Sequence, residues 1–276
     1  MAVEVTIKQN GPIRDYKLEA FIKDKFKYGV LDNHYRLIIG EHGKNMILYA
    51  PDMIGRGIDF RIETDGIFLR LSIPSGSNEI NIFYDLIKDV AEMFGAKEFV
   101  RNEKTESIED ITKLKEENIN ESIEALKDVK ADFEKGEVDR YTIFGALNPL
   151  VLGKAEIKRI DCDLNNLDTY LHEVQNTDAY FAAPTLYRYG SEIIGVYAVK
   201  EFIAHILPKK PYVQLPDGKE VKDFYVKCTE SPEDIVRYKD LYKNLRNTKY
   251  YDADHIVVEI SGEDIKNVLT RHRVKL

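Results

Sequence analysis

Cysteine and tryptophan are scarce in this chain of 276 residues, which contains two cysteines and no tryptophan. Two thiols are too few for a disulfide framework or for a four-cysteine zinc site. Cys162 and Cys228 each lie in an apolar or alternating stretch, where a free thiol packs as a small hydrophobic side chain. We therefore expect both cysteines to have structural roles.

Long apolar runs are also absent. No segment approaches the roughly 18 to 20 consecutive apolar residues that cross a bilayer. The first residues, MAVEVTIKQNGP, lack the charged start and the apolar region of a signal peptide. Because 43% of the residues are apolar, the chain still has enough hydrophobic side chains for a sizeable core. These features predict a folded cytoplasmic protein that does not bind membranes.

The usual signatures of enzymatic sites are missing as well. The sequence has no glycine-rich dinucleotide or phosphate-binding motif, no H-E-x-x-H zinc motif and no G-x-S-x-G hydrolase motif. No cofactor is therefore expected. This pattern favours a protein without catalytic activity and leaves the question of an enzyme open.

Negative charge is concentrated in one part of the sequence. The formal net charge is −8, and residues 103–137 contain 12 acidic and 6 basic residues, so this segment alone contributes −6. An acidic surface repels the phosphate backbone of nucleic acids, and no run of basic residues is interleaved with aromatic ones. Nucleic acid is therefore not an expected partner.

The first hundred residues have the pattern of strands followed by a helix. Apolar and polar residues alternate over 58–73 on both sides of Asp65-Gly66, which predicts a hairpin with one buried face. Apolar residues then recur at helical spacing between Ser77, a predicted cap, and Gly95, a predicted end. We expect this helix to cover the apolar face of the hairpin.

The acidic segment has the pattern of a helix with a narrow apolar stripe. Ser107 and Asp110 form a predicted capping box, and residues 118–120 mark a point where one long helix or two shorter ones are alternatives. So thin a stripe is typical of a connector between two domains. A helix that binds a partner is the alternative.

The second half of the sequence again has the pattern of strands. A second hairpin with a Pro-Asp-Gly turn is predicted over 211–228, then a helix that starts at a Ser231 cap, a strand over 250–260 and a last helix capped by Ser261. Before these, strands are predicted over 141–153, 155–164, 178–189 and 191–199.

Two parts of the chain share the order hairpin, helix and strand. Residues 58–101 and 212–260 align at a shift of 155 positions, which suggests an internal duplication. Chance agreement between two amphipathic helices is the alternative. We therefore predict an α+β fold with two mainly antiparallel sheet units, 1–102 and 138–276, each with a covering helix, joined by the acidic helical connector 103–137.

The stretch YYDADHIVVEI contains three side chains able to bind a metal, namely Asp252, Asp254 and His255. In an extended chain, alternation places the two aspartates on one face and the histidine on the other. All three reach one ion only if the backbone bends at Ala253-Asp254. A turn before a strand is the favoured interpretation. The alternative is a divalent-metal enzyme that acts on a phosphorylated or glycosylated substrate.

Tyrosine is abundant, with 17 residues concentrated in the second half. Tyrosine combines a large contact area with a polar end and is enriched at recognition surfaces. This composition predicts an interaction surface that includes Tyr187, Tyr189, Tyr250 and Tyr251. The preference of tyrosine for strands is the alternative explanation of the count.

Several segments carry a resemblance to a known family, namely IGRGIDFRI, SNEINIFYDLIKDVAEMFG, RYTIFGALNPLVL, YFAAPTLYRYG, IIGVYAV, LPKKPYV and YYDADHIVVEI. With these, the chain resembles a family of uncharacterised proteins from Gram-positive bacteria of the Firmicutes type. The resemblance implies a bacterial cytoplasmic protein and carries no activity with it. We predict a non-enzymatic module that binds a protein partner through the tyrosine-rich second unit or the acidic connector, with oligomeric state left open.

Overall fold

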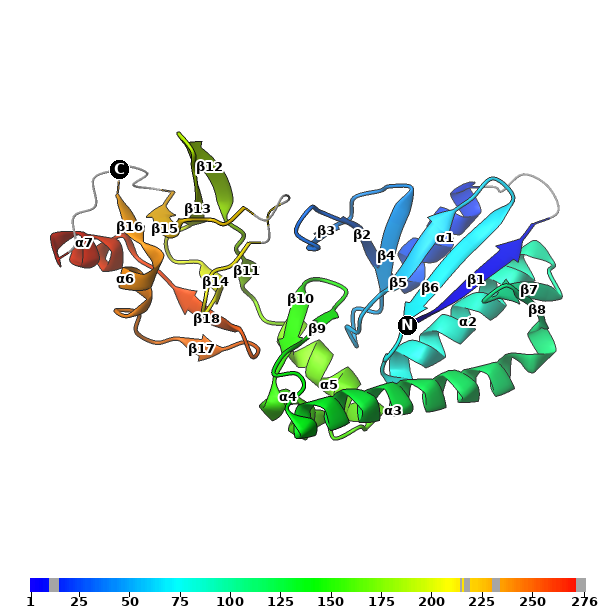
Figure 1. Ribbon diagram of the computed structural model, residues 1–276. Helices are drawn as coiled ribbons and strands as arrows, with labels where there is room; N and C mark the ends of the chain where they lie inside the picture. Colours follow the sequence, from blue (N-terminus) through cyan, green and yellow to red (C-terminus); the bar gives the residue numbers. More distant parts are fainter. Residues whose placement is uncertain (10–14, 214, 216–218, 230–233, 272–276) are drawn as a thin grey trace. The chain divides into compact units, whose positions relative to one another are not determined.

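The computed structural model describes residues 1–9, 15–213, 215, 219–229 and 234–271, and it shows an α+β fold (Figure 1). The chain divides into two compact units, Met1–Asn176 and Thr177–Leu276, called unit 1 and unit 2 below. Among the described residues, no helix is long and apolar enough to cross a membrane.

Unit 1 is built around an antiparallel sheet of eight strands in the order β3-β2-β4-β5-β6-β1-β7-β8. The strands are β1 (Ala2–Lys8), β2 (Lys27–Leu31), β3 (Leu37–Ile39), β4 (Asn45–Tyr49), β5 (Ile58–Ile62), β6 (Gly66–Ser72), β7 (Glu98–Arg101) and β8 (Lys104–Ser107). The predicted hairpin over 58–73 is confirmed as β5 and β6.

Helices α1 (Asp15–Lys25) and α2 (Ser77–Phe94) cover one face of this sheet (Figure 1). Val5 and Leu69, which face each other on β1 and β6, are fully buried. The two helices are joined by an ion pair, in which Lys25 Nζ lies 2.7 Å from Asp89 Oδ2. Burial of this apolar face supplies the main driving force for folding of unit 1.

The ends of α2 test the predicted helix signals. Gly95 ends the helix in the left-handed region, at φ 65°, as predicted. The predicted Ser77 cap is wrong, because Gly76 is the N-cap and makes no side-chain capping bond. The backbone N–H of Asn78 instead donates to Asp168 Oδ2 at 2.7 Å. A carboxylate 90 residues away in the sequence thus caps α2.

The acidic segment forms β8, a short 3-10 turn η1 (Ile108–Asp110) and one continuous helix α3 (Ile111–Lys135). Helix α3 packs against α2 and α5 (Leu164–Gln175) with its apolar side buried. No break occurs at 118–120, because Asn118 is buried and accepts a hydrogen bond from the hydroxyl of Tyr84. The two units meet in the sequence at 176/177, and the positions 102/103 and 137/138 both fall inside unit 1.

The rest of unit 1 is a hairpin followed by two helices. The predicted strand over 155–164 is wrong, because α4 forms there and buries Ile157 and Ile160 on one side. Asp163 then caps α5 and accepts hydrogen bonds from the N–H groups of Asn165 and Asn166. These elements are β9 (Tyr141–Phe144), β10 (Pro149–Leu152), α4 (Lys154–Ile160) and α5.

A buried polar cluster surrounds the start of α2. Glu79 is almost fully buried and accepts hydrogen bonds from the Gly57 N–H at 2.5 Å and from Ser75 Oγ at 2.9 Å. Arg56 Nη1 donates to the Pro74 carbonyl at 2.8 Å. Asp168 lies against Gly76, since a Cβ there would lie 1.9 Å from Asp168 Oδ1. This cluster ties the β4–β5 loop and α5 to α2.

Unit 2 contains two four-stranded sheets, ordered β11-β14-β18-β17 and β12-β13-β15-β16. One pair in each sheet is parallel, and the other pairs are antiparallel. The strands are β11 (Tyr180–Phe181), β12 (Thr185–Tyr189), β13 (Glu192–Val199), β14 (Ala204–Pro208), β15 (Asp223–Cys228), β16 (Ile235–Arg237), β17 (Lys249–Tyr250) and β18 (His255–Glu259).

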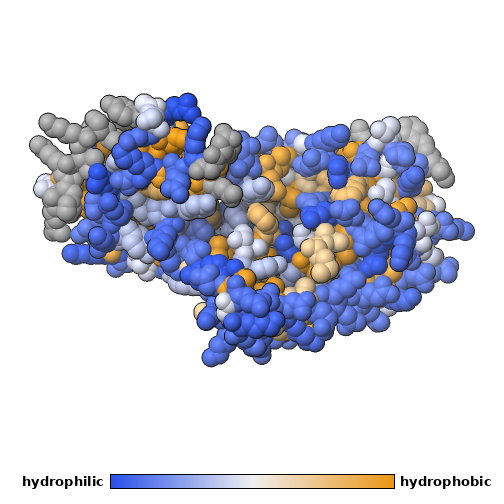
Figure 2. Space-filling model, in the orientation of Figure 1, coloured by the Kyte–Doolittle hydropathy of each residue, from blue (hydrophilic) through white to orange (hydrophobic). Residues whose placement is uncertain are grey.

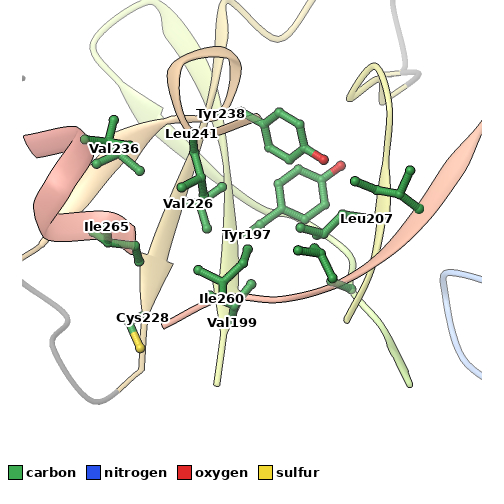
Figure 3. Close-up of a cluster of buried hydrophobic side chains, with 14 residues drawn as sticks. Tyr197, Val199, Leu207, Val226, Cys228, Val236, Tyr238, Leu241, Ile260 and Ile265 are labelled. Atoms are coloured by element: carbon green, nitrogen blue, oxygen red, sulfur yellow. The ribbon is translucent and has the colours of Figure 1, made fainter. Parts of the chain in front are cut away.

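The core of unit 2 draws side chains from both sheets and from α6 (Tyr238–Tyr242) and α7 (Gly262–Arg271) (Figure 3). The rings of Tyr197 and Tyr238 lie side by side, with centroids 5.2 Å apart, and burial raises the pKa of both hydroxyls. The Tyr238 hydroxyl donates to the Pro208 carbonyl at 2.5 Å.

The predicted cap of the last helix, α7, is confirmed. The backbone N–H of Ser261 donates to the Asp264 carboxylate, and the backbone N–H of Asp264 donates to the Ser261 hydroxyl.

The predicted duplication is contradicted by the strand order. In unit 1, β7 joins the same sheet as the β5–β6 hairpin, whereas in unit 2 β18 and β15 belong to different sheets. Residues 235–237 form strand β16 where a helix was predicted, and α6 is only five residues long. The predicted turn at 216–218 and the Ser231 cap lie outside the described residues. Shared apolar spacing alone explains the alignment.

Candidate functional site

Two of the predicted metal ligands, Asp252 and Asp254, lie where the chain bends at residues 252–254, and the third, His255, is the first residue of β18. The bend brings His255 Nδ1 to 2.8 Å from Asp252 Oδ1. The same oxygen accepts the backbone N–H groups of Asp254 at 2.9 Å and of His255 at 2.8 Å. Asp252 is fully buried, and these contacts are those of a turn stabilised by an aspartate side chain.

A lysine already supplies positive charge to this bend. Lys209 Nζ donates to the carbonyls of Asp252 at 3.0 Å and of Ala253 at 2.7 Å. A second cation beside this ammonium group would be repelled. In the part of the chain that the structure describes, no three His, Cys, Asp or Glu side chains come together as metal ligands would.

Replacing Asp252 by asparagine tests the turn. The amide oxygen can still accept the backbone N–H groups and a His255 ring N–H, but these bonds lose the negative charge of the carboxylate. We expect the free energy of unfolding to fall by about 1 kcal/mol in chemical denaturation. An unchanged free energy, or a wild-type melting temperature that rises with Mg²⁺, Mn²⁺ or Zn²⁺, would contradict a purely structural turn.

The tyrosines predicted to form one interaction surface differ in their exposure. Tyr187 and Tyr250 are exposed, at 46% and 58% of their surface. Tyr251 is 3% exposed and its ring contacts Phe181 and His255, so its expected place on a surface is corrected. The side chain of Tyr189 lies outside the part that the structure describes.

Strand β12, which carries Tyr187, lies at the edge of its sheet. It pairs with β13 from Thr185↔Val196 to Tyr189↔Glu192, and among the described strands it has no neighbour on its other side. Figure 1 shows this hairpin extending from the rest of unit 2. An edge strand presents backbone N–H and C=O groups to which another strand can pair.

Exposure is continuous over the residues of β12 whose side chains the structure describes. All four residues from Thr185 to Arg188 are exposed, including Leu186 at 39%. Leu186 and Tyr187 lie on opposite faces, so both faces of this strand present an apolar side chain. Sequence reasoning identified Tyr187 but missed Leu186, because alternation cannot show which strand lies at an edge.

The comparisons with known proteins give one match. No match to the chain is found among curated proteins, and none is found among solved structures. A family model described as a domain of unknown function, DUF4299, matches residues 2–268. The match spans both units, in agreement with the resemblance to an uncharacterised family. The chain therefore belongs to the DUF4299 family.

Proposed function

We propose that the protein is a non-enzymatic binding module, in which the free edge of β12 in unit 2 accepts an extended segment of a partner protein. The exposed edge strand with Leu186 and Tyr187 is the observation that carries this proposal. We further propose that this binding occurs in a bacterial cytoplasm, and the resemblance to proteins of Gram-positive bacteria supports this.

The energetics favour strand addition at this edge. Backbone hydrogen bonds between β12 and an added strand supply affinity, while side-chain contacts on the two faces supply selectivity. Burial of a fully exposed leucine contributes about 1.5 to 3 kcal/mol, and Leu186, at 39% exposed, can gain part of that. Tyrosines that become fully desolvated are common anchors of interfaces. Leu186 and Tyr187 offer one such contact on each face.

The acidic helix α3 is less suited to this role. Four of its apolar residues, Ile111, Leu114, Leu126 and Phe133, are buried within unit 1. A partner that binds a helix through its apolar face needs that face exposed. Positive charge at the bend weighs against the metal-enzyme alternative, because Lys209 donates to the carbonyls of Asp252 and Ala253.

Photo-crosslinking tests the proposed edge. A photoreactive residue at Leu186 should yield one discrete crosslinked protein from the native cell extract. The same residue at Met93, which is similarly exposed at 37% but lies on α2 of unit 1, is the matched control. The same products from both positions, or a product made only of two copies of this chain, would contradict the proposal.

Replacing Tyr187 by lysine should weaken binding of the captured partner about tenfold, because the ring no longer packs and a charge must be desolvated. Replacing Tyr187 by phenylalanine keeps the ring and should leave affinity nearly unchanged. Isothermal calorimetry with purified partner measures both. Equal affinities of the lysine variant and the wild type would remove Tyr187 from the interface.

A further inference from the structure

The sheet of unit 1 has a hollow of about 440 Å³ on the face opposite α1 and α2. Figure 2 shows hydrophobic side chains among hydrophilic ones over this part of the molecule. Pockets for small molecules typically measure about 300 to 1,000 Å³, so this hollow has room for a small organic ligand. Its lining includes Leu31, Asn45, Ile47, Arg61 and Phe68.

Strand register explains why charged groups line this face. Asp59 and Arg61 alternate along β5 with Ile58 and Phe60, which are buried. Residues that alternate in a strand point to opposite faces of the sheet. The buried set contributes to the core below the helices, and the charged set therefore faces the hollow.

One of the two arginines in the hollow is neutralised. Arg70 Nη1 lies 2.9 Å from Asp59 Oδ2, and Arg70 Nε lies 3.6 Å from Glu4 Oε1. Asp59, Arg70 and Glu4 are direct cross-strand neighbours on β5, β6 and β1. This row of two carboxylates and one guanidinium carries one net negative charge.

The second arginine, Arg61, has no such partner among the described residues. The Arg61 guanidinium lies over the Phe68 ring, 4.2 Å from its centroid, and the two residues are cross-strand neighbours. Within the described part of the chain, no carboxylate lies within ion-pair distance of Arg61. A guanidinium stacked on a ring keeps its N–H groups directed outward, in the geometry that binds a carboxylate through two parallel hydrogen bonds.

We propose that this hollow binds a small organic molecule that has one carboxylate and an apolar body. The carboxylate pairs with Arg61, and the apolar body packs against Phe68 and Leu31. A monocarboxylate fits better than a doubly charged phosphate, because Glu4 and Asp59 leave the hollow with no excess positive charge. This site lies in unit 1 and is separate from the protein-binding edge proposed for unit 2.

Nuclear magnetic resonance titration of the full chain tests the site. The probes are benzoate, phenylacetate and octanoate at millimolar concentrations, with benzyl alcohol as the neutral counterpart of benzoate. At least one carboxylate should shift the Arg61 Nε–H and Asn45 side-chain signals together, and benzyl alcohol should shift them much less. No shift at these groups with any of the three carboxylates, or equal shifts with the alcohol, would overturn the proposal.

Variants give a second readout. Replacing Arg61 by glutamine should weaken binding of the responding carboxylate about tenfold, since a charge-assisted pair is lost. Replacing Arg61 by lysine keeps the positive charge but removes the pair of parallel N–H donors, and it should give an intermediate affinity. Arg246→Gln, an exposed arginine of unit 2, is the control for net charge. Equal carboxylate affinities of Arg61→Gln and Arg246→Gln would overturn the assignment of the site. The Tyr187→Lys variant should bind the carboxylate as tightly as the wild type.

Discussion

Replacing Gly57 by alanine is expected to lower the free energy of unfolding by about 3 kcal/mol. Gly57 has a φ of +82°, a conformation that side chains with a Cβ rarely adopt. An added Cβ would also lie 2.4 Å from Ile47 Cγ2 and 3.2 Å from the Ala146 Cβ. Strain in the backbone and a steric clash therefore act together at this position.

The surroundings of Gly57 leave little room for relaxation. Ile47, Tyr49, Ile54 and Ala146 form a small buried apolar cluster beside it. Its N–H donates to the buried carboxylate of Glu79 at 2.5 Å. A shift of the backbone to relieve the clash would weaken this bond and leave a buried carboxylate less well satisfied, which is costly.

Gly95 provides a matched control. It also has a positive φ, at +65°, but an added Cβ would meet no atom within 4 Å. Gly95→Ala should therefore lower the free energy of unfolding through backbone strain alone, by about 1 kcal/mol. Urea denaturation of both variants and the wild type measures the difference. If the two substitutions cost the same free energy, close packing at Gly57 makes no contribution.

Local patterns predicted the elements of this fold better than their assembly. The β5–β6 hairpin and the C-terminal end of α2 follow from residues within a few positions of one another, such as Asp65-Gly66 and Gly95. The N-terminal cap of α2 does not follow from nearby residues, because the acceptor of its hydrogen bond, Asp168, lies on α5. No pattern within α2 shows that a carboxylate from elsewhere replaces the Ser77 cap.

The role of α3 shows the same limit. Its thin apolar stripe predicts burial of one side correctly, yet the stripe does not show what buries it. The structure places α2 and α5 there, and polar Asn118 and Ser122 are buried in the contact. A polar residue buried against a neighbouring helix looks like a surface residue in the sequence. Residues 103–137, the segment predicted as a connector, lie within unit 1.

The candidate site depends on tertiary contacts to an even greater degree. Tyrosine content predicted exposed Tyr187 and Tyr250, but Tyr251, the next residue in the chain, is buried. Only sheet order identifies β12 as an edge. Likewise, the sequence around Arg61 and Arg70 does not distinguish the two arginines. Cross-strand pairing places carboxylates beside Arg70, and these neutralise its charge.

Replacing Asp168 by asparagine is the second substitution with a large expected effect, and its effect depends on pH. Asp168 is 3% exposed, and burial raises the pKa of its carboxyl from 3.8 to about 6. The hydrogen bond from the Asn78 backbone opposes this rise, and the charge of Glu79 adds to it. An asparagine side chain still offers an oxygen to the Asn78 N–H but does not ionise.

The direction of the effect follows from proton linkage. Because the folded-state pKa is raised, the folded protein binds this proton more tightly than the unfolded chain does. The resulting stabilisation is complete below the unfolded pKa of 3.8 and is lost as the pH rises through about 6. The full difference of about two pKa units corresponds to about 3 kcal/mol, and solvent screening reduces the expected value to about 2 kcal/mol.

Denaturation curves at several pH values measure this difference. The free energy of unfolding of Asp168→Asn minus that of the wild type should increase by about 2 kcal/mol between about pH 4 and pH 7, then stay level. The ¹³C shift of the Asp168 carboxyl in the wild type should have its midpoint near the same pKa of about 6. Parallel pH profiles of the two proteins would mean that Asp168 ionises as readily in the fold as in the unfolded chain. The Asp168 cap would then favour the ionised carboxyl enough to offset its burial, because a carboxylate at a helix N-terminus is stabilised by the N–H groups there.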